Sequence, residues 1–142
     1  MHVPKQQVKK FNVQVKRISQ QQAVAVTHGD KITLAIQGKD PNLGFTAPEA
    51  VLAAFGACIL SNVTKLAAEM GLQIDDVGIE FSALKRLQPL GYDDLQYTLT
   101  IQSPESRGEL QALYERAVSD GTATNALLEG LKPQGQLSIH PK

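Results

Sequence analysis

Apolar and polar residues alternate along the first quarter of the chain, which is the period-two pattern of a half-buried β-strand. The alternation covers residues 11–16 and 32–37, with an apolar-rich stretch at 23–27 between them. The sequence HGD at residues 28–30 separates the second and third stretches, and its glycine can adopt the positive φ of a tight turn. The chain is therefore predicted to open with a three-stranded antiparallel meander.

A long helix is predicted to follow the loop at residues 38–45. Thr46 and Glu49 have the spacing of a capping box, in which the threonine oxygen accepts the Glu49 N–H and the glutamate reaches back. The helix is expected to run to Met70 and to end at Gly71, a favourable residue just past a helix end. Its first half is apolar on every side, so we expect it to be buried all round.

The second half of the chain is predicted to begin with a strand at residues 77–81, for which an extension to Leu87 is left open, a turn at 89–93 and a strand at 95–102. Helices at 105–118 and 124–129 and a closing strand at 136–140 are predicted to follow. The resulting order is βββ-α-ββ-αα-β. Strands that are grouped rather than alternating with helices indicate an α+β fold. A chain of 142 residues fits one domain, so a single domain over residues 1–142 is predicted.

Charge is balanced overall but uneven along the chain, which bears on nucleic-acid binding. Residues 1–29 hold five of the 14 basic residues and none of the 14 acidic residues. A basic arm can bind nucleic acid, but Phe11 is its only aromatic residue for stacking on bases. We therefore expect no nucleic-acid partner, and the arm is interpreted as a solvated strand face.

Location is inferred from the apolar runs and from cysteine usage. The longest apolar run, residues 50–60, is shorter than the roughly 18 residues that span a membrane. A signal peptide has an apolar stretch behind its basic residues, and the amino terminus of this chain has none, so no signal peptide is expected. One cysteine, expected to be reduced, favours a cytoplasmic location without membrane partners. The three histidines lack ligand spacing, so no metal site is expected. The sequence has no P-loop or dinucleotide fingerprint, so no other cofactor is expected.

Cys58 is the only thiol, and two interpretations of it are open. A lone cysteine is commonly a small buried hydrophobe. However, Ser61, Asn62, Lys65 and Glu69 follow at offsets that share one helical face. Cys58 thus lies where the apolar half of the helix meets a polar stripe, and a thiol at such a boundary is partly exposed, as reactivity requires.

A low thiol pKa would need a cation from elsewhere in the fold. The helix dipole fades beyond the first turn, and Cys58 lies about three turns in. Arg17, Arg86 and Lys85 are the alternatives, and the sequence does not choose among them. Glu49 stands nine residues before Cys58, about 13 Å along a helix and on its opposite face. If the two share a site, one must come from a second subunit.

The segment GFTAPEAVLAAFGACILSNVTKLAAEMGLQIDDVGIEF, residues 44–81, resembles the family of osmotically inducible protein C and organic hydroperoxide resistance proteins (OsmC/Ohr). The resemblance implies an intertwined homodimer, with antiparallel sheets around two long, buried, cysteine-bearing helices. It also implies a peroxidase in which a first cysteine attacks the hydroperoxide and a second closes a disulfide. Cys58 matches the first, but Gly121 occupies the resolving position, so that internal disulfide cannot form.

Other residues are assigned by the same resemblance. The acid Glu49 stands nine rather than ten residues before the cysteine, which looks more like the broad OsmC-like branch than the peroxidase branches. Arg17 best matches the family's thiolate-stabilising arginine. The expected binding residues are Phe55, Ser61 and Asn62.

Two functions are therefore weighed. The first is a single-cysteine reductase of organic hydroperoxides in oxidative stress defence, dependent on an external thiol. The second is a non-catalytic homodimer that binds a small apolar ligand at its subunit interface.

Overall fold

The computed structural model describes residues 10–38, 40–119, 125, 129–130 and 132–140. It comprises two compact units, Met1–Val51 and Leu52–Lys142, each of which is described by itself. The single domain over residues 1–142 stays a prediction. The predicted third helix at 124–129 and Gly121 lie largely or wholly outside the described residues.

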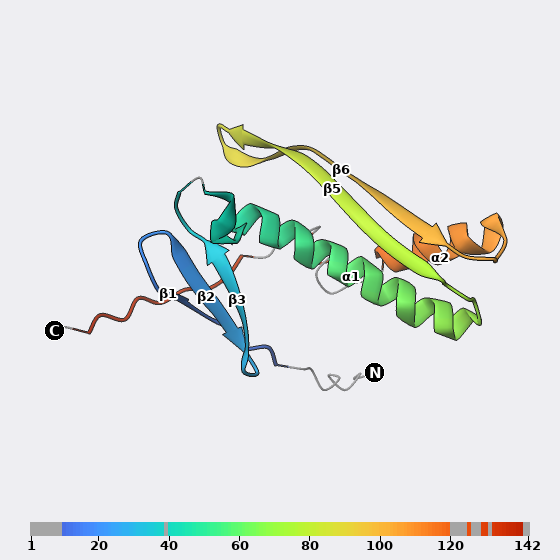
Figure 1. The fold of residues 1–142 in the computed structure, drawn as a ribbon, viewed down its shortest axis with the longest axis horizontal. Helices are drawn as coiled ribbons and strands as arrows, with labels where there is room; N and C mark the ends of the chain where they lie inside the picture. The colour runs from blue at the N-terminus through green and yellow to red at the C-terminus, as the bar shows by residue number, and fades with distance from the viewer. Residues whose placement is uncertain (1–9, 39, 120–124, 126–128, 131, 141–142) are drawn as a thin grey trace, which may run out of the picture. The chain divides into compact units, whose positions relative to one another are not determined.

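The first unit contains the predicted antiparallel meander (Figure 1). Its elements are β1 (Gln14–Arg17), β2 (Gln22–Thr27), β3 (Asp30–Ala35), the short 3-10 helix η1 (Pro41–Leu43) and β4 (Phe45–Thr46). The turn between β2 and β3 has positive φ at Gly29 (84°), as predicted, and also at His28 (52°). The loop after β3 adds β4, which pairs parallel with β3 and which the sequence pattern did not predict.

The meander is more exposed than its alternation predicted. The strand registers place Val15, Ala25 and Ile32 in one row across the sheet. Ala25 is buried, but Val15 and Ile32 are 61% and 60% exposed. The expectation of a half-buried first strand is wrong for this chain, since every residue of β1 is exposed. The alternation reflects an apolar sheet face, and no second layer within this unit covers it.

The long helix α1 (Ala47–Met70) begins and ends as predicted. Thr46 Oγ1 accepts the Glu49 N–H at 3.4 Å, and Glu49 Oε1 accepts the Thr46 N–H at 2.9 Å, which completes the capping box. At the other end Gly71 has a φ of 69°. The Leu72 N–H then donates to the Ala67 carbonyl at 2.8 Å, the long hydrogen bond of a Schellman motif.

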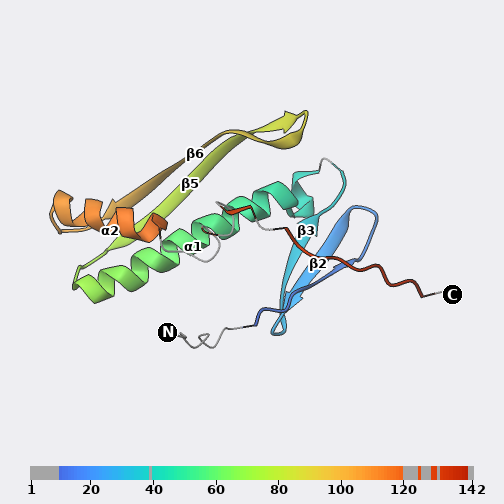
Figure 2. The same ribbon diagram turned by 180° about the vertical axis from the view of Figure 1, so that it is seen from behind.

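The second unit packs α1 against a hairpin and a second helix (Figures 1 and 2). The further elements are β5 (Asp76–Leu87), β6 (Leu90–Gln102) and α2 (Arg107–Ser119). The core cluster consists of Ile59, Val63, Leu66 and Ala67 of α1 and Leu113 and Ala117 of α2. Half-buried side chains of both strands pack against this cluster, so the hairpin forms one wall of the core.

Three predicted boundaries in this unit are corrected. The β5–β6 connection is only residues 88–89, because Leu87 pairs with Leu90 and the strand resumes there. Helix α2 starts two residues late, because Ser106 caps it by accepting the Glu109 N–H. Residues 136–140 form no strand, and Leu137 and Ile139 are 82% and 76% exposed. An alternating stretch becomes a strand only when an edge pairs with it.

Within the single chain, the first half of α1 is not buried all round, and its burial by a partner chain stays a prediction. Gly56 and Ile59 are buried, whereas Val51 is 39% exposed and Ala57 is also exposed. Among the described residues, α1 is the one helix long and apolar enough to cross a membrane by length and composition. The core helix of a soluble protein passes the same test, and α1 supplies most of the core cluster while exposing Lys65. We therefore interpret α1 as a core helix.

Candidate functional site

Cys58 lies on α1 next to the residues that face the core. The side chain is half-buried, so it is neither sealed in the core nor fully solvated. Two residues earlier, Gly56 is buried against β5, where an added Cβ would meet Ile79 Cγ2 at 3.0 Å and Phe81 Cε2 at 3.1 Å. The following residue, Ile59, is fully buried. Cys58 is thus held on a turn of helix that the core fixes in place.

The polar stripe predicted beyond Cys58 is partly solvated and partly structural. Ser61, Lys65 and Glu69 are exposed. Asn62 is half-buried, and its Nδ2 donates to the Ala117 carbonyl at 3.0 Å. This hydrogen bond joins α1 to α2 one turn beyond the cysteine. Asn62 therefore has a structural role that its position in the sequence did not reveal, while the binding roles of Ser61 and Asn62 stay predictions.

Phe55, one turn before Cys58, belongs to an aromatic cluster with Phe81 of β5 and Tyr97 of β6. The Phe55 and Phe81 rings meet edge to face, with centroids 5.3 Å apart and an interplanar angle of 85°. The Tyr97 ring lies 5.6 Å from Phe81 and 6.5 Å from Phe55. Such pairs contribute about 0.5–1.5 kcal/mol beyond their buried area. The cluster anchors the cysteine-bearing turn to the hairpin.

A pair of tyrosine hydroxyls extends this cluster to α2. The Tyr97 and Tyr114 hydroxyl oxygens lie 2.7 Å apart. Burial, and then the hydrogen bond and charge of Tyr114, raise the pKa of Tyr97 to about 12. With this raised pKa, Tyr97 is a neutral hydrogen-bonding group at neutral pH. Both the aromatic cluster and the hydroxyl pair join residues far apart in the sequence, so no local sequence pattern predicts them.

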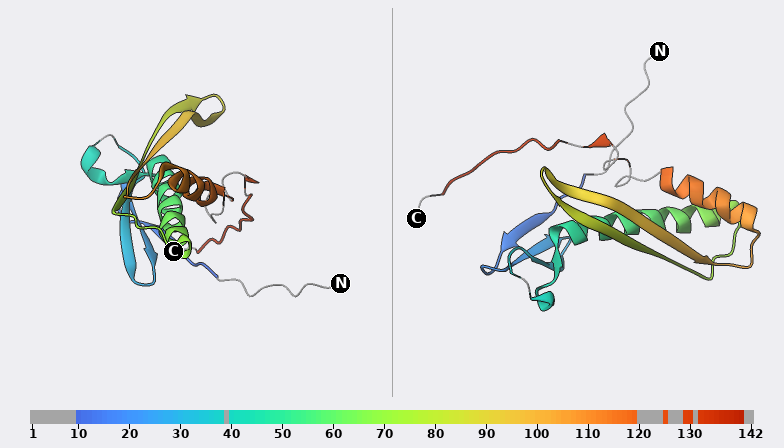
Figure 3. Two further views of the ribbon diagram at one scale, coloured as in Figure 1. Left: turned by 90° about the vertical axis from the view of Figure 1, so that its right-hand side faces the viewer. Right: turned by 90° about the horizontal axis from the view of Figure 1, so that it is seen from above.

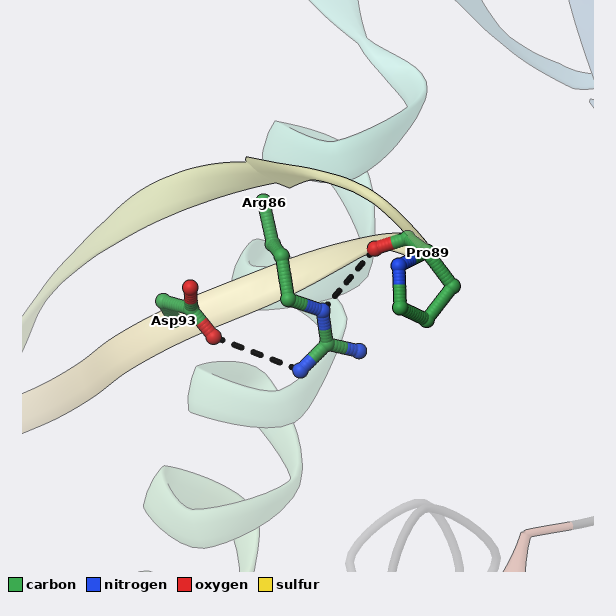
Figure 4. A network of polar contacts seen from close by, with 3 residues as sticks. All are labelled: Arg86, Pro89 and Asp93. Carbon is green, nitrogen blue, oxygen red and sulfur yellow. Dashed lines mark hydrogen bonds and ion pairs between the residues drawn. The ribbon is translucent and has the colours of Figure 1, made fainter.

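The candidate cation Arg86 is engaged in the turn of its own hairpin (Figure 4). Its Nε donates to the Pro89 carbonyl at 2.9 Å, and its Nη1 lies 3.3 Å from Asp93 Oδ1. An added Cβ at Gly91 would meet Arg86 Nη2 at 2.7 Å, so the guanidinium packs closely on the opposite strand. Arg86 is thereby explained as a residue that stabilises the turn, which weakens it as a candidate for activating a thiol.

Arg17 and Glu49 belong to the first unit. Arg17 is exposed at the end of β1. The backbone N–H and the hydroxyl of Thr46 both donate to Glu49 and lower its pKa, so Glu49 is a carboxylate at neutral pH. Glu49 also contributes to the wall of a cavity of about 470 Å³, whose other lining residues are Ala35, Gly38, Asp40, Gly44, Phe45 and Thr46. The catalytic roles of both residues stay predictions.

Comparison with known proteins shows the family. A family model described as OsmC-like protein matches residues 37–134, more than half of the chain. The chain therefore belongs to the OsmC-like family, and the predicted α+β fold class is confirmed. No curated protein sequence matches the chain significantly.

Solved structures share the fold at low sequence identity. An OsmC-like protein from Mycoplasma pneumoniae is 21% identical, with a TM-score of 0.78 and coverage of 84% of this chain and 88% of that one. An organic hydroperoxide resistance protein from Legionella pneumophila is 17% identical, with a TM-score of 0.64 over 86% and 91% of the two chains. The organic hydroperoxide resistance protein OhrB of Bacillus subtilis is 18% identical, with a TM-score of 0.57 over 82% and 90%.

Proposed function

We propose that this protein is a cytoplasmic, homodimeric thiol-dependent reductase of organic hydroperoxides that acts in oxidative stress defence. The observation that carries the proposal is the half-buried position of Cys58 on the core helix of an OsmC-like fold. Its structural neighbours include proteins named for organic hydroperoxide resistance, which supports a stress-related role. Family membership supports this reaction class. Because the chain has one cysteine, its cycle must differ from a two-cysteine cycle that closes an internal disulfide.

The proposed reaction begins with the Cys58 thiolate. The thiolate sulfur attacks the terminal oxygen of the hydroperoxide, and the O–O bond breaks as the new S–O bond forms. The alkoxide leaves with the electron pair and takes up a proton to become an alcohol, while Cys58 becomes a sulfenic acid. The sulfur is thereby oxidised by two electrons and the peroxide is reduced by two.

The second half of the cycle needs an external thiol, because the chain has one cysteine and Gly121 stands at the resolving position. A thiol attacks the sulfenic acid sulfur, and water leaves as a mixed disulfide forms. A second thiol then attacks the mixed disulfide at the sulfur of the first external thiol, which releases the Cys58 thiol and the disulfide of the two external thiols. Two external thiols are consumed for each hydroperoxide.

Arg17 is proposed to stabilise the thiolate, and Glu49 of the partner chain to orient the reacting groups. Glu49 and Cys58 stand nine residues apart on one continuous helix, about 13 Å along its axis and on opposite faces. A single chain therefore does not bring them together along the helix. The exposed apolar residues Val51 and Ile32, 39% and 60% exposed, support a homodimer that covers them.

The oligomeric state is tested by light scattering at micromolar concentration. A mass near twice the 15.4 kDa of the chain is expected. A mass of one chain would contradict both the dimer and the proposed role of Glu49.

The activity test compares wild type with Cys58→Ser and with Ala68→Ser. The second variant places a hydroxyl at an exposed position of the same helix, so it controls for a general effect of substitution. Wild type and Ala68→Ser are expected to consume cumene hydroperoxide with an added thiol and to form a dimedone adduct at Cys58. Cys58→Ser is expected to do neither while keeping the dimer mass.

The alternative is a non-catalytic dimer that binds a small apolar ligand at its interface, favoured by the missing resolving cysteine. Equal hydroperoxide consumption by wild type and Cys58→Ser with every thiol tested would contradict the enzyme. A further variant, Gly121→Cys, is expected to form an internal disulfide with Cys58 on oxidation if the family geometry is kept.

A further inference from the structure

A second cavity lies wholly within the unit Leu52–Lys142. Its volume is about 340 Å³, at the lower end of the range for small-molecule sites, and it is a shallow depression open to solvent. Its lining residues come from the last part of β6, the loop that follows and the first turns of α2. Figure 3 shows the short loop that connects β6 to α2. The lining residues are Leu99, Ile101, Glu105, Arg107, Leu110, Gln111 and Tyr114.

The floor of this cavity is apolar and firmly held. Leu99 of β6 and Leu110 of α2 are half-buried and pack against the core cluster, and Ile101 is half-buried beside them. Tyr114 adds an aromatic wall, and its hydroxyl is tied to that of Tyr97 at 2.7 Å. A branched or aromatic side chain of a ligand would find a preformed apolar surface here.

The rim of the cavity carries one carboxylate and one guanidinium. Glu105 Oε2 accepts the Gln73 N–H at 2.7 Å, while Ser103 Oγ donates to the Gln73 carbonyl at 2.6 Å and accepts the Glu105 N–H at 3.1 Å. These bonds fix the Glu105 carboxylate at the cavity. Among the described residues, no hydrogen bond is made to its other oxygen, which can accept one from a cationic ligand group.

Arg107 supplies the opposite charge. Within the described part of the chain the one ion pair is Arg86–Asp93, so Arg107 has no carboxylate partner there. The first turn of α2 is already capped, because Ser106 Oγ accepts the Glu109 N–H at 3.2 Å. The anion-binding capacity of this rim therefore comes from the Arg107 side chain rather than from the helix end.

From these two charges over an apolar floor we infer that the cavity binds a small zwitterion with an apolar side chain, as in a branched or aromatic α-amino acid. Arg107 pairs with the ligand carboxylate and Glu105 with its ammonium, as charge-assisted hydrogen bonds. The side chain lies on Leu99, Ile101 and Leu110. This site goes beyond the proposed hydroperoxide chemistry and does not depend on Cys58.

The test uses three probes that share an isobutyl group: L-leucine, isocaproate, which lacks the ammonium, and isoamylamine, which lacks the carboxylate. Backbone amide spectra of the full-length protein are recorded by nuclear magnetic resonance during titration. Leucine is expected to shift amides around residues 99–114 saturably, and each truncated probe to bind about tenfold more weakly or worse. If leucine does not approach saturation at about 10 mM, its affinity is weaker than a specific site of this kind requires, and the proposal is overturned.

Variants then assign the two charges. Arg107→Gln and Glu105→Gln are each expected to weaken leucine binding about tenfold, and the glutamine at 105 keeps an oxygen for the Gln73 N–H. Arg116→Gln, on the last turn of the same helix and outside the cavity lining, is the matched control and is expected to bind leucine like wild type. Isocaproate binding as tightly as leucine, or equal losses in all three variants, would overturn the zwitterion assignment. Because the readout is binding, failure here leaves the hydroperoxide proposal untouched.

Discussion

Gly56 lets α1 pack closely against the hairpin, and Gly56→Ala tests whether a larger side chain is tolerated at this contact. An added Cβ would meet Ile79 Cγ2 at 3.0 Å and Phe81 Cε2 at 3.1 Å, closer than the 3.5–4.0 Å of optimal carbon contact. Both neighbours are held in place: Phe81 belongs to the aromatic cluster with Phe55 and Tyr97, and Ile79 packs against the core cluster. The methyl group therefore forces a shift in a packed wall.

Two opposing terms decide the outcome of Gly56→Ala. Alanine stabilises a helix interior by about 0.8–1.0 kcal/mol over glycine. Overpacking of a filled core costs about 1–3 kcal/mol. The net expectation is a loss of about 1 kcal/mol in the free energy of unfolding, or about 3 °C in Tm for a chain of this size.

The control is Gly108→Ala on α2, where an added Cβ meets nothing within 4 Å. This variant keeps the helix-propensity gain without the steric cost, so it is expected to be as stable as wild type or slightly more stable. Both variants are measured by denaturant unfolding followed by circular dichroism, at one protein concentration because dimerisation links stability to concentration. Stabilisation of Gly56→Ala equal to that of Gly108→Ala would refute the reasoning.

Three further predictions concern buried and capping groups. Tyr97, whose pKa is raised from 10.0 to about 12, is expected to keep its proton in the folded protein at pH values where the unfolded chain has lost it. Its contribution to the free energy of unfolding is therefore full below pH 10 and is lost as the pH rises towards 12. Denaturant unfolding across that pH range is expected to show a weaker pH dependence for Tyr97→Phe than for wild type. Leu113→Ala removes a fully buried side chain and is expected to cost about 2–5 kcal/mol in the same unfolding assay, and a loss under 1 kcal/mol would show that the site collapses around the gap. Thr46→Ala removes the hydroxyl that accepts the Glu49 N–H and is expected to cost about 0.5–2 kcal/mol, whereas unchanged stability would show that the capping box does not stabilise α1.

The features that sequence reasoning predicted correctly depend on neighbours within a few residues. The capping box needs only Thr46 and Glu49 three positions apart, and the end of α1 needs only a glycine able to hold a φ of 69° at Gly71. The turn at Gly29 follows the same logic. These interactions form whatever the rest of the chain does, so a local pattern is sufficient to predict them.

Burial and strand pairing were predicted less well, because both depend on what lies opposite. The alternation before β2 correctly marks an apolar face, yet Val15 is 61% exposed. The similar alternation around Leu137 and Ile139 forms no strand in this chain. A strand is completed by hydrogen bonds to a second backbone, and the sequence of one segment does not say whether that backbone is present.

The sequence by itself determined the fold class, the place of Cys58 on a long helix and the absence of a second cysteine. Tertiary structure alone decided what surrounds that helix: the contact of Gly56 with Ile79 and Phe81, and the tie from Asn62 to α2. It also brought Glu105 and Arg107 to one cavity with apolar residues of β6 and α2. These groups come from separate helices, strands and loops, and their meeting depends on how the hairpin and α2 pack on α1. That packing is a sum of many weak contacts between residues distant in sequence, which no short pattern encodes.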